Sequence, residues 1–115
     1  MLRGEIRLVD LEPVRAAEAN KRRPAVIVSN DRANSTAARL GRGVVTVVPV
    51  TSNVAHVYPF QVALPADQTG LRVDSKAQAE QVRAVSVERV GSVLGVVPAR
   101  LMAQVDDALR LHLQL

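Results

Sequence analysis

The sequence contains no cysteine and no tryptophan, and its only Tyr and Phe are Tyr58 and Phe60. The lack of cysteine excludes disulfides, thiol nucleophiles and cysteine-ligated metals. With so few aromatic rings, the core has to be built from Val, Leu and Ala, and the many valines favour strands. No apolar run approaches the roughly 20 residues that cross a bilayer, and the charged N-terminus carries no signal peptide. We therefore expect one domain over residues 1–115, in the cytoplasm and with no membrane as a partner.

Motifs for metal or nucleotide cofactors are also missing. His56 and His112 have no ligand spacing of the H-E-x-x-H kind. Asp106 and Asp107 are adjacent on an expected helix, about 100° apart, so they cannot readily hold one ion together. The sequence contains neither a G-x-x-x-x-G-K-[ST] phosphate loop nor a G-x-S-x-G elbow. It therefore predicts no metal and no cofactor, and argues against P-loop ATPases and α/β-hydrolases.

Positive charge is concentrated in the first half of the chain. The formal net charge is +4, and residues 1–60 hold nine Lys or Arg against five Asp or Glu. Thirteen of the fifteen cations are arginine, the side chain that binds phosphate through two parallel hydrogen bonds. This distribution suggests a polyanionic partner, nucleic acid before membrane. Ordinary solubility charge in an organism that prefers arginine is the alternative.

Hydrophobic periodicity indicates a small, mostly β domain that ends in a helix. Strands are expected at 5–11, 24–28, 44–50, 60–64 and 91–97. A short helix, capped by Asp31, is expected to run to residue 38. An amphipathic helix is expected at 98–113, with His112 on the apolar face that packs against the sheet. Residues 12–23 and 51–58 are read as loops. Residues 75–85 leave two structures open, because their propensities favour a helix while their alternation suits a strand with a bulge.

Two strands carry polar side chains where they meet a loop. Lys21-Arg22-Arg23 leads into Pro24–Val28, and Val44–Val50 is followed by Thr51-Ser52-Asn53. If these strands are neighbours, Arg23 and Thr51 project into one site. Arginine beside a hydroxyl suits phosphoryl transfer on RNA, where the substrate's own 2′-hydroxyl attacks and the enzyme aligns and neutralises the phosphate. Spacing alone leaves an alternative without catalysis, in which Arg23-Pro24 only begins a strand and Thr51-Ser52-Asn53 only forms a turn.

Three blocks of the chain, in order over nearly its whole length, resemble the MazF/PemK (Kid) family of toxins from type II toxin–antitoxin systems. They are Arg3-Gly4-Glu5-Ile6 with Val9-Asp10-Leu11, Pro13 and Glu18; Arg23-Pro24-Ala25-Val26-Ile27-Val28-Ser29-Asn30-Asp31; and Val48-Pro49-Val50-Thr51-Ser52-Asn53 with Asp74-Ser75 and Glu80-Gln81-Val82-Arg83. The pairing of R-P-x-x-V-x-[SQ]-N-D with P-[VI]-T is fairly specific for that family.

The resemblance implies an SH3-like, CcdB/Kid-type small β-barrel with a C-terminal helix, assembled as a homodimer, and it favours strand over helix at 75–85. It implies a metal-independent endoribonuclease that cuts single-stranded mRNA at a short sequence, leaving 2′,3′-cyclic phosphate and 5′-hydroxyl ends. A cognate MazE-like antitoxin with an acidic C-terminal tail would silence it. Arg23 and Thr51 match the family's catalytic pair. The RNA-binding residues implied are Glu18, Asn20, Lys21, Arg22, Ser52, Asn53 and His56.

The chain also departs from the family pattern. Arg7 stands where many relatives have Trp, and Ala16-Ala17 precedes Glu18 where they have Gly-Ser. These departures bear on cleavage specificity and activity rather than on the Arg23/Thr51 pair. Two other functions remain open from sequence: a DNA gyrase poison of the same fold, as CcdB is, and a non-catalytic SH3-like module that binds RNA or protein.

Overall fold

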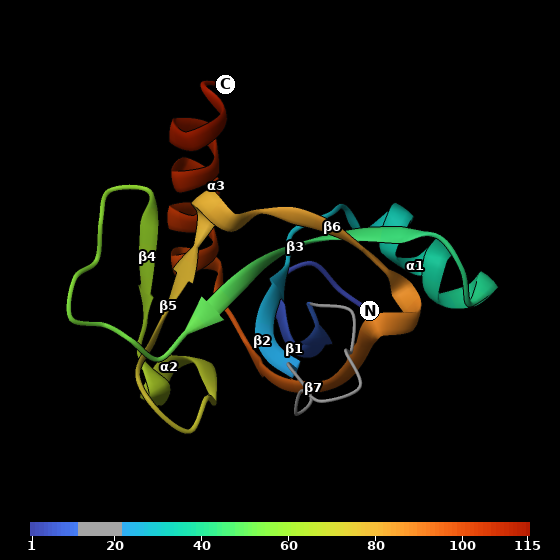
Figure 1. Ribbon diagram of the computed structural model, residues 1–115, viewed down its shortest axis with the longest axis horizontal. Coiled ribbons are helices and arrows are strands. Elements are labelled where there is room, and N and C mark those ends of the chain that lie inside the picture. Colours follow the sequence, from blue (N-terminus) through green and yellow to red (C-terminus); the bar gives the residue numbers. More distant parts are fainter. Residues whose placement is uncertain (12–21) are drawn as a thin grey trace, which may run out of the picture.

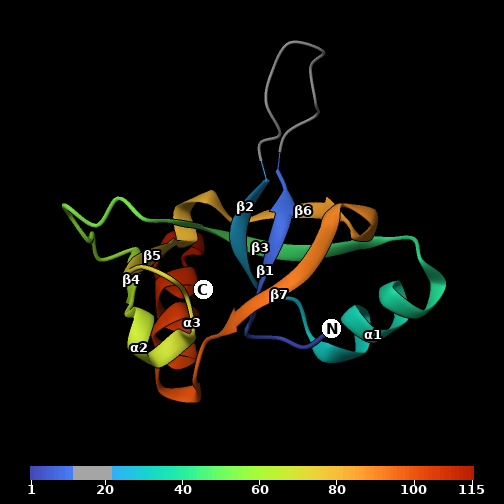
Figure 2. The same cartoon turned by 90° about the horizontal axis from the view of Figure 1, so that it is seen from below.

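A computed structural model of the chain describes residues 1–11 and 22–115. The strands are β1 (Glu5–Asp10), β2 (Arg22–Ile27), β3 (Val44–Thr51), β4 (Gln61–Leu64), β5 (Ser75–Gln78), β6 (Arg83–Ser86) and β7 (Val90–Val96). The helices are α1 (Asp31–Leu40), α2 (Ala66–Thr69) and α3 (Ala99–Leu113), with short 3₁₀ turns η1 (Ala79–Gln81) and η2 (Val87–Arg89). Figures 1 and 2 place α1 and α3 at opposite ends of the molecule.

The seven strands form one antiparallel sheet in the order β4-β5-β3-β2-β1-β7, with β6 paired to β3. Strand β3 organises the sheet: β2 pairs along one of its edges, while β6 and β5 pair with the first and second halves of the other. The mostly β fold with a C-terminal helix is as predicted. The paired strands of the described residues do not form a closed ring, so the expected barrel is a curved, open sheet (Figure 1).

Hydrophobic side chains form a core on each face of the sheet. The core between the sheet and α3 includes Ile6, Val26, Val48, Val50, Leu64, Leu101, Met102 and Val105. The other core, beside α1, includes Val9, Ala25, Ile27, Ala37, Val45, Val47 and Val85. Neighbouring residues of β2 and β3 alternate between the two cores because successive strand side chains point to opposite faces. The register of β2 against β3 is therefore fixed from both sides.

The turn after β2 explains the Ser-Asn-Asp sequence there. Asn30, rather than the predicted Asp31, is the N-cap of α1, and its side chain accepts the amide of Ala33 at 2.8 Å. The fully buried Asn34 donates its side-chain amide to the carbonyl of Ser29 at 2.8 Å. Short polar side chains thus satisfy the helix N-terminus as capping requires. The helix extends to Leu40, two residues beyond the prediction.

Residues 75–85 form two short strands rather than one helix. Strand β5 pairs with β4 and with the second half of β3, and β6 pairs with the first half of β3. The 3₁₀ turn η1 lies between them, where the two phases of alternation in the sequence meet. The strand expectation is confirmed, with η1 in the place of the expected bulge.

Helix α3 packs its apolar face on the sheet as its spacing predicts. Leu101, Met102, Val105 and Ala108 are buried, but His112 is exposed, because the last turns of the helix project past the sheet. Among the residues that the structure describes, no helix is long and apolar enough to cross a membrane.

Arg7, which stands where many MazF/PemK relatives have Trp, connects two strands. Its Nε donates to Oε1 of Glu5 at 3.0 Å, and its Nη1 donates to the carbonyl of Gly91 in β7 at 3.0 Å. Burial raises the pKa of Glu5, but hydrogen bonds from the Leu2 amide and from Arg7, together with the Arg7 charge, outweigh it and leave that pKa below its ordinary value. Arg7 thus links β1 to β7 through Glu5 and the Gly91 carbonyl.

Candidate nucleic-acid cleavage site

The pairing of β2 with β3 brings Arg23 and Thr51 to the same end of the sheet. Ala25 is opposite Pro49 in an antiparallel register. This pairing ends at Ala25 and Pro49, and Arg23 and Thr51 each lie two residues beyond it on their own strands. Because side chains alternate along a strand, both take the same face as Ala25 and Pro49. Strand β2 begins at Arg22, so Arg23 lies within a paired strand rather than in the loop predicted from sequence. Its backbone is therefore held by β1, which improves the positioning of the side chain.

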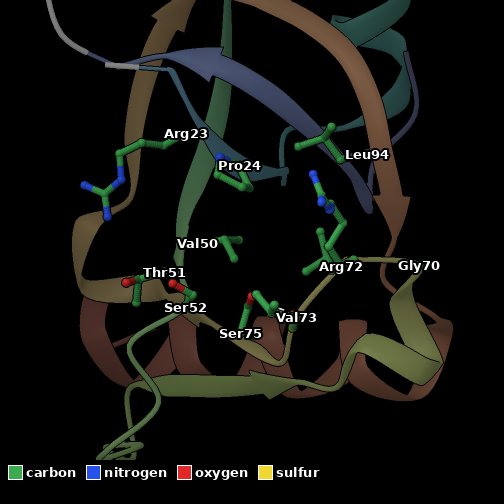
Figure 3. A pocket seen from close by; sticks show the side chains of 11 residues that line it. Arg23, Pro24, Val50, Thr51, Ser52, Gly70, Arg72, Val73, Ser75 and Leu94 are labelled. Carbon is green, nitrogen blue, oxygen red and sulfur yellow. Dashed lines mark hydrogen bonds between the residues drawn. The ribbon is translucent and has the colours of Figure 1, made fainter. Parts of the chain in front are cut away.

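Both side chains border one pocket of about 390 Å³ (Figure 3). The pocket is lined by Arg23, Pro24, Val50, Thr51, Ser52, Gly70, Leu71, Arg72, Val73, Ser75 and Leu94. Figure 3 shows Arg23 and the hydroxyls of Thr51 and Ser52 on one side, and Arg72 across the pocket from them. The guanidinium of Arg23 is directed outward at the pocket edge, and Arg23 also lines a neighbouring hollow with Leu11, Pro49, Gln78, Gln81 and Arg83. Four segments far apart in sequence therefore build one site: the start of β2, the end of β3, the stretch from Gly70 to Ser75, and Leu94 in β7.

The Thr51 hydroxyl already accepts one hydrogen bond from the protein backbone. Its Oγ1 accepts the backbone amide of Asn53 at 3.2 Å, and Asn53 in turn accepts the amide of Ala55 through Oδ1 at 3.4 Å. A hydroxyl that accepts through one lone pair keeps its own proton for donation. Thr51 is half-buried at the pocket edge, so this proton is available to a bound oxyanion.

The pocket is positively charged. Two arginines line it, and its described lining contains no Asp, Glu or His. Guanidinium groups donate paired hydrogen bonds to phosphate oxygens and keep their charge at any physiological pH. The site is thus suited to bind a phosphate and to stabilise extra negative charge on it. In the described parts of the chain, no three His, Asp or Glu side chains lie close enough together to hold a metal ion.

Not all of the residues implied by the family resemblance lie in this pocket. Ser52 lines it, but Arg22 points to a separate hollow that it shares with Asp10 and Glu88. Arg22 and Arg23 are neighbours in a strand, so their side chains leave on opposite faces. Asn53 shapes the turn after β3 through its side chain. Glu18, Asn20 and Lys21 lie outside the described residues.

The loop from Ser52 to Phe60, which carries His56, is held by a buried lysine that the sequence did not single out. Lys76 in β5 is 7% exposed, and its Nζ donates to the carbonyl of His56 at 2.6 Å. The same ammonium lies 5.7 Å from the ring centre of Tyr58, a cation–π arrangement. Tyr58 stacks on Phe60 with ring centres 5.4 Å apart. Lys76 therefore fixes the loop after the Thr51 turn.

We expect Lys76→Met to loosen this loop locally. Methionine preserves the length of the buried stem but removes the bond to the His56 carbonyl, while relief of ammonium burial offsets part of the cost for the whole domain. Backbone amides at 53–59 should exchange with solvent about tenfold faster, with global stability changed by less than about 1 kcal/mol. Hydrogen exchange followed by mass spectrometry measures this. Arg39→Met, on an exposed helix position, is the matched control. Unchanged exchange at 53–59 would contradict the role of Lys76.

Arg72 and Ser75 are the polar side chains of the pocket that sequence reasoning did not assign to a site. Arg72 is a single cation in a stretch to which the sequence assigned no secondary structure, with no motif around it. Its place in the site depends on how the chain after α2 folds back beside β7, which periodicity does not reveal. Ser75 was recognised only as part of a family block, and the structure adds that it is buried at the pocket wall.

Comparison with known proteins identifies the family. The family model of the PemK-like, MazF-like toxin of type II toxin-antitoxin system matches residues 2–113. The chain is 65% identical to endoribonuclease MazF9 of Mycobacterium tuberculosis over 115 residues, covering all of this chain and 98% of that protein.

Solved structures show the same fold. The crystal structure of MazF from Deinococcus radiodurans superposes with a TM-score of 0.76 at 29% identity, covering 100% of this chain and 97% of that one. A MazE–MazF crystal structure from the same organism gives a TM-score of 0.72 at 28% identity, over 99% of this chain and 96% of that one. The likeness therefore extends over the whole chain.

Proposed function

Because the chain belongs to the family of PemK-like, MazF-like toxins of type II toxin–antitoxin systems, we propose that it is an endoribonuclease that cleaves single-stranded RNA with Arg23 and Thr51 as its catalytic residues. The observation that carries this proposal is that a strand-borne arginine and a threonine hydroxyl border the same cationic pocket. The 65% identity with a protein named as an endoribonuclease supports the same activity.

The proposed reaction is a transfer within the substrate. The 2′-oxygen of one nucleotide attacks the adjoining phosphorus and loses its proton, the bond from phosphorus to the 5′-oxygen breaks, and that oxygen gains a proton. The products are a 2′,3′-cyclic phosphate and a 5′-hydroxyl. Arg23 stabilises the negative charge that develops on the non-bridging oxygens, and the Thr51 hydroxyl donates to the same phosphate and orients it. The nucleophile is the substrate's own, so the step requires no protein nucleophile and no metal ion.

The remaining residues act by holding the RNA. Lys21 binds a phosphate of the RNA, which positions the substrate without reading its sequence. Arg22 leaves β2 on the face opposite Arg23, so its phosphate contact lies outside the pocket. Ser52 belongs to the same pocket as the catalytic pair. Glu18, Asn20, Asn53 and His56 belong to the loops that select the cleaved sequence. The cleaved RNA is mRNA in the cytoplasm, so the toxin inhibits translation and growth.

Two protein partners follow from the family. A cognate antitoxin neutralises the toxin by covering the cationic groove with a flexible acidic tail that folds on binding. The toxin itself acts as a homodimer, which is supported by the exposed apolar side chains of Val93 and Val96 on edge strand β7 and of Leu111 and Leu113 at the end of α3.

The two other functions weighed from sequence have less support. A gyrase poison or a binding module does not need a hydroxyl and a guanidinium placed across adjacent strands at one pocket. The family match over residues 2–113 also favours the PemK/MazF toxins.

The test is to incubate the purified protein with a long, unstructured RNA in EDTA and to identify the new ends chemically. The proposal predicts cyclic-phosphate and 5′-hydroxyl ends at a short recurring sequence. An RNA with a 2′-deoxy sugar at the mapped cut should stay intact, since it lacks the attacking oxygen. Cleavage of the 2′-deoxy RNA, or products with 5′-phosphate ends, would contradict the mechanism.

A further inference from the structure

The pocket contains a second cation that the proposed chemistry does not use. Arg72 lines the pocket across from Arg23 and Thr51 (Figure 3). It is exposed, and within residues 1–11 and 22–115 its guanidinium takes part in no hydrogen bond or ion pair. An arginine has five N–H donors. Those of Arg72 are available to a ligand in the pocket.

The segment that presents Arg72 is tightly bonded. Gly70 adopts φ +83° and donates its amide to the carbonyl of Ala66 at 3.0 Å, which ends α2 in a left-handed cap. The Leu71 amide donates to Oγ1 of Thr69 at 3.3 Å. On the other side of Arg72, Oδ1 of Asp74 accepts the amide of Ala66 at 2.8 Å. Arg72 is therefore carried by a short segment whose two ends are both anchored to α2.

The space between the two arginines has the size and lining for one nucleoside. A volume of about 390 Å³ is at the small end of ligand pockets. Its apolar wall comes from Pro24, Val50, Leu71, Val73 and Leu94, which suits the face of a base, and its polar atoms are the hydroxyls of Thr51, Ser52 and Ser75. The cations stand at opposite sides of this space, as the phosphates stand on either side of a nucleoside in a strand.

We propose that Arg72 binds the phosphate next to the scissile one, and that the pocket holds the nucleoside between them. This inference rests on the proposed function, because it takes the phosphate at Arg23 and Thr51 as the one that is cleaved. Two bound phosphates fix both ends of one nucleotide. Arg72 thereby fixes the position of the RNA strand along the pocket, so that the attacking 2′-oxygen and the phosphorus are aligned at Thr51.

Binding of an uncleavable RNA tests the site. The probe is a short single-stranded RNA with the mapped cut sequence and a 2′-deoxy attacking sugar. We expect Arg72→Ala to weaken binding of this RNA about tenfold or more. The slope of the logarithm of the binding constant against the logarithm of the salt concentration should become less steep by about one. Arg39→Ala removes the same charge from α1 at the other end of the molecule and should change neither quantity.

A backbone substitution locates the phosphate. Replacing single linkages beside the cut with neutral methylphosphonates should reveal one position at which the wild-type protein loses as much affinity as Arg72→Ala does. Arg72→Ala should lose no further affinity at that position, because the contact is already gone. The phosphate contact would be wrong if no single methylphosphonate reproduced the loss of affinity and the loss caused by Arg72→Ala depended instead on which base stands in the RNA.

The outcomes separate this inference from the proposed function. If Arg72→Ala binds like Arg39→Ala while the wild-type protein cleaves RNA, the Arg72 contact is wrong and the proposed function stands. If the wild-type protein cleaves no RNA, mixed-sequence single-stranded RNA serves as the binding probe. If Arg72→Ala then binds this RNA more weakly than the wild type does, Arg72 binds a phosphate but the protein is not a nuclease. If the two proteins bind it equally well, both the Arg72 contact and the proposed function are wrong.

Discussion

Arg23→Ala should reduce kcat/KM for RNA cleavage at least about 10³-fold. Removal of one preorganised donor from a developing oxyanion typically costs 10²- to 10³-fold, and loss of an arginine that stabilises a phosphoryl-transfer transition state costs about 10³- to 10⁵-fold. Arg23 is exposed and packs in neither core, so the variant should unfold at the same denaturant concentration as the wild type. Single-turnover cleavage of an RNA with one cut site measures the rate.

Arg23→Lys is the matched variant. Lysine keeps the positive charge but lacks the planar fork that donates two parallel hydrogen bonds. We expect an intermediate rate, about 10- to 100-fold below wild type, since a charge-assisted bond is lost while the charge stays. If Arg23→Ala cleaves at more than a tenth of the wild-type rate, Arg23 does not act on the transition state.

The largest stability effect should come from Gly95→Ala in β7. A Cβ built at Gly95 lies only 2.3 Å from the carbonyl oxygen of Thr69 and 3.6 Å from the carbonyl carbon of Gly70. The obstacle is backbone, so it cannot rotate away as a side chain can. Overpacking of this kind costs about 1–3 kcal/mol or more, and we expect the free energy of unfolding to fall by about 3 kcal/mol. Urea denaturation followed by circular dichroism measures it.

Gly91→Ala is the control for Gly95→Ala in the same strand. There the nearest atom to a new Cβ is the carbonyl oxygen of Leu8 at 3.0 Å, a tight contact that a shift of a few tenths of an ångström relieves. Its cost should be about 1 kcal/mol or less. Equal stabilities of the two variants would show that β7 does not press against the end of α2 at Gly95. That contact supports the wall of the pocket from which Arg72 projects.

The position of the Arg23/Thr51 pair could be predicted because it depends on strand periodicity. Alternating apolar residues fix which face each side chain takes, and the pairing of β2 with β3 then brings Arg23 and Thr51 to the same end of the sheet. The sequence placed the start of β2 two residues too late. Pro24 carries no amide donor and marks a strand edge in most sequences, but the pairing with β1 continues past it to Arg22.

Other parts of the site could not be predicted because they depend on contacts between distant segments. Lys76 has the sequence context of an exposed strand residue, and only the pairing of β5 with β3 and β4 buries it beneath the His56 loop. Arg72 enters the pocket because Gly95 allows β7 to approach the end of α2. Neither the burial of Lys76 nor the contact of β7 with the end of α2 produces a periodic pattern in the sequence.

The claim that Arg23 and Thr51 act as one unit on one phosphate is tested most directly by a double-mutant cycle. The rates of cleavage by the wild type, Arg23→Ala, Thr51→Val and the double variant are compared in single turnover. If both side chains stabilise the same transition state, Thr51→Val should slow the wild type about 10- to 100-fold but slow Arg23→Ala by much less. Effects that multiply in full would contradict the account, since they would mean that the two residues act independently.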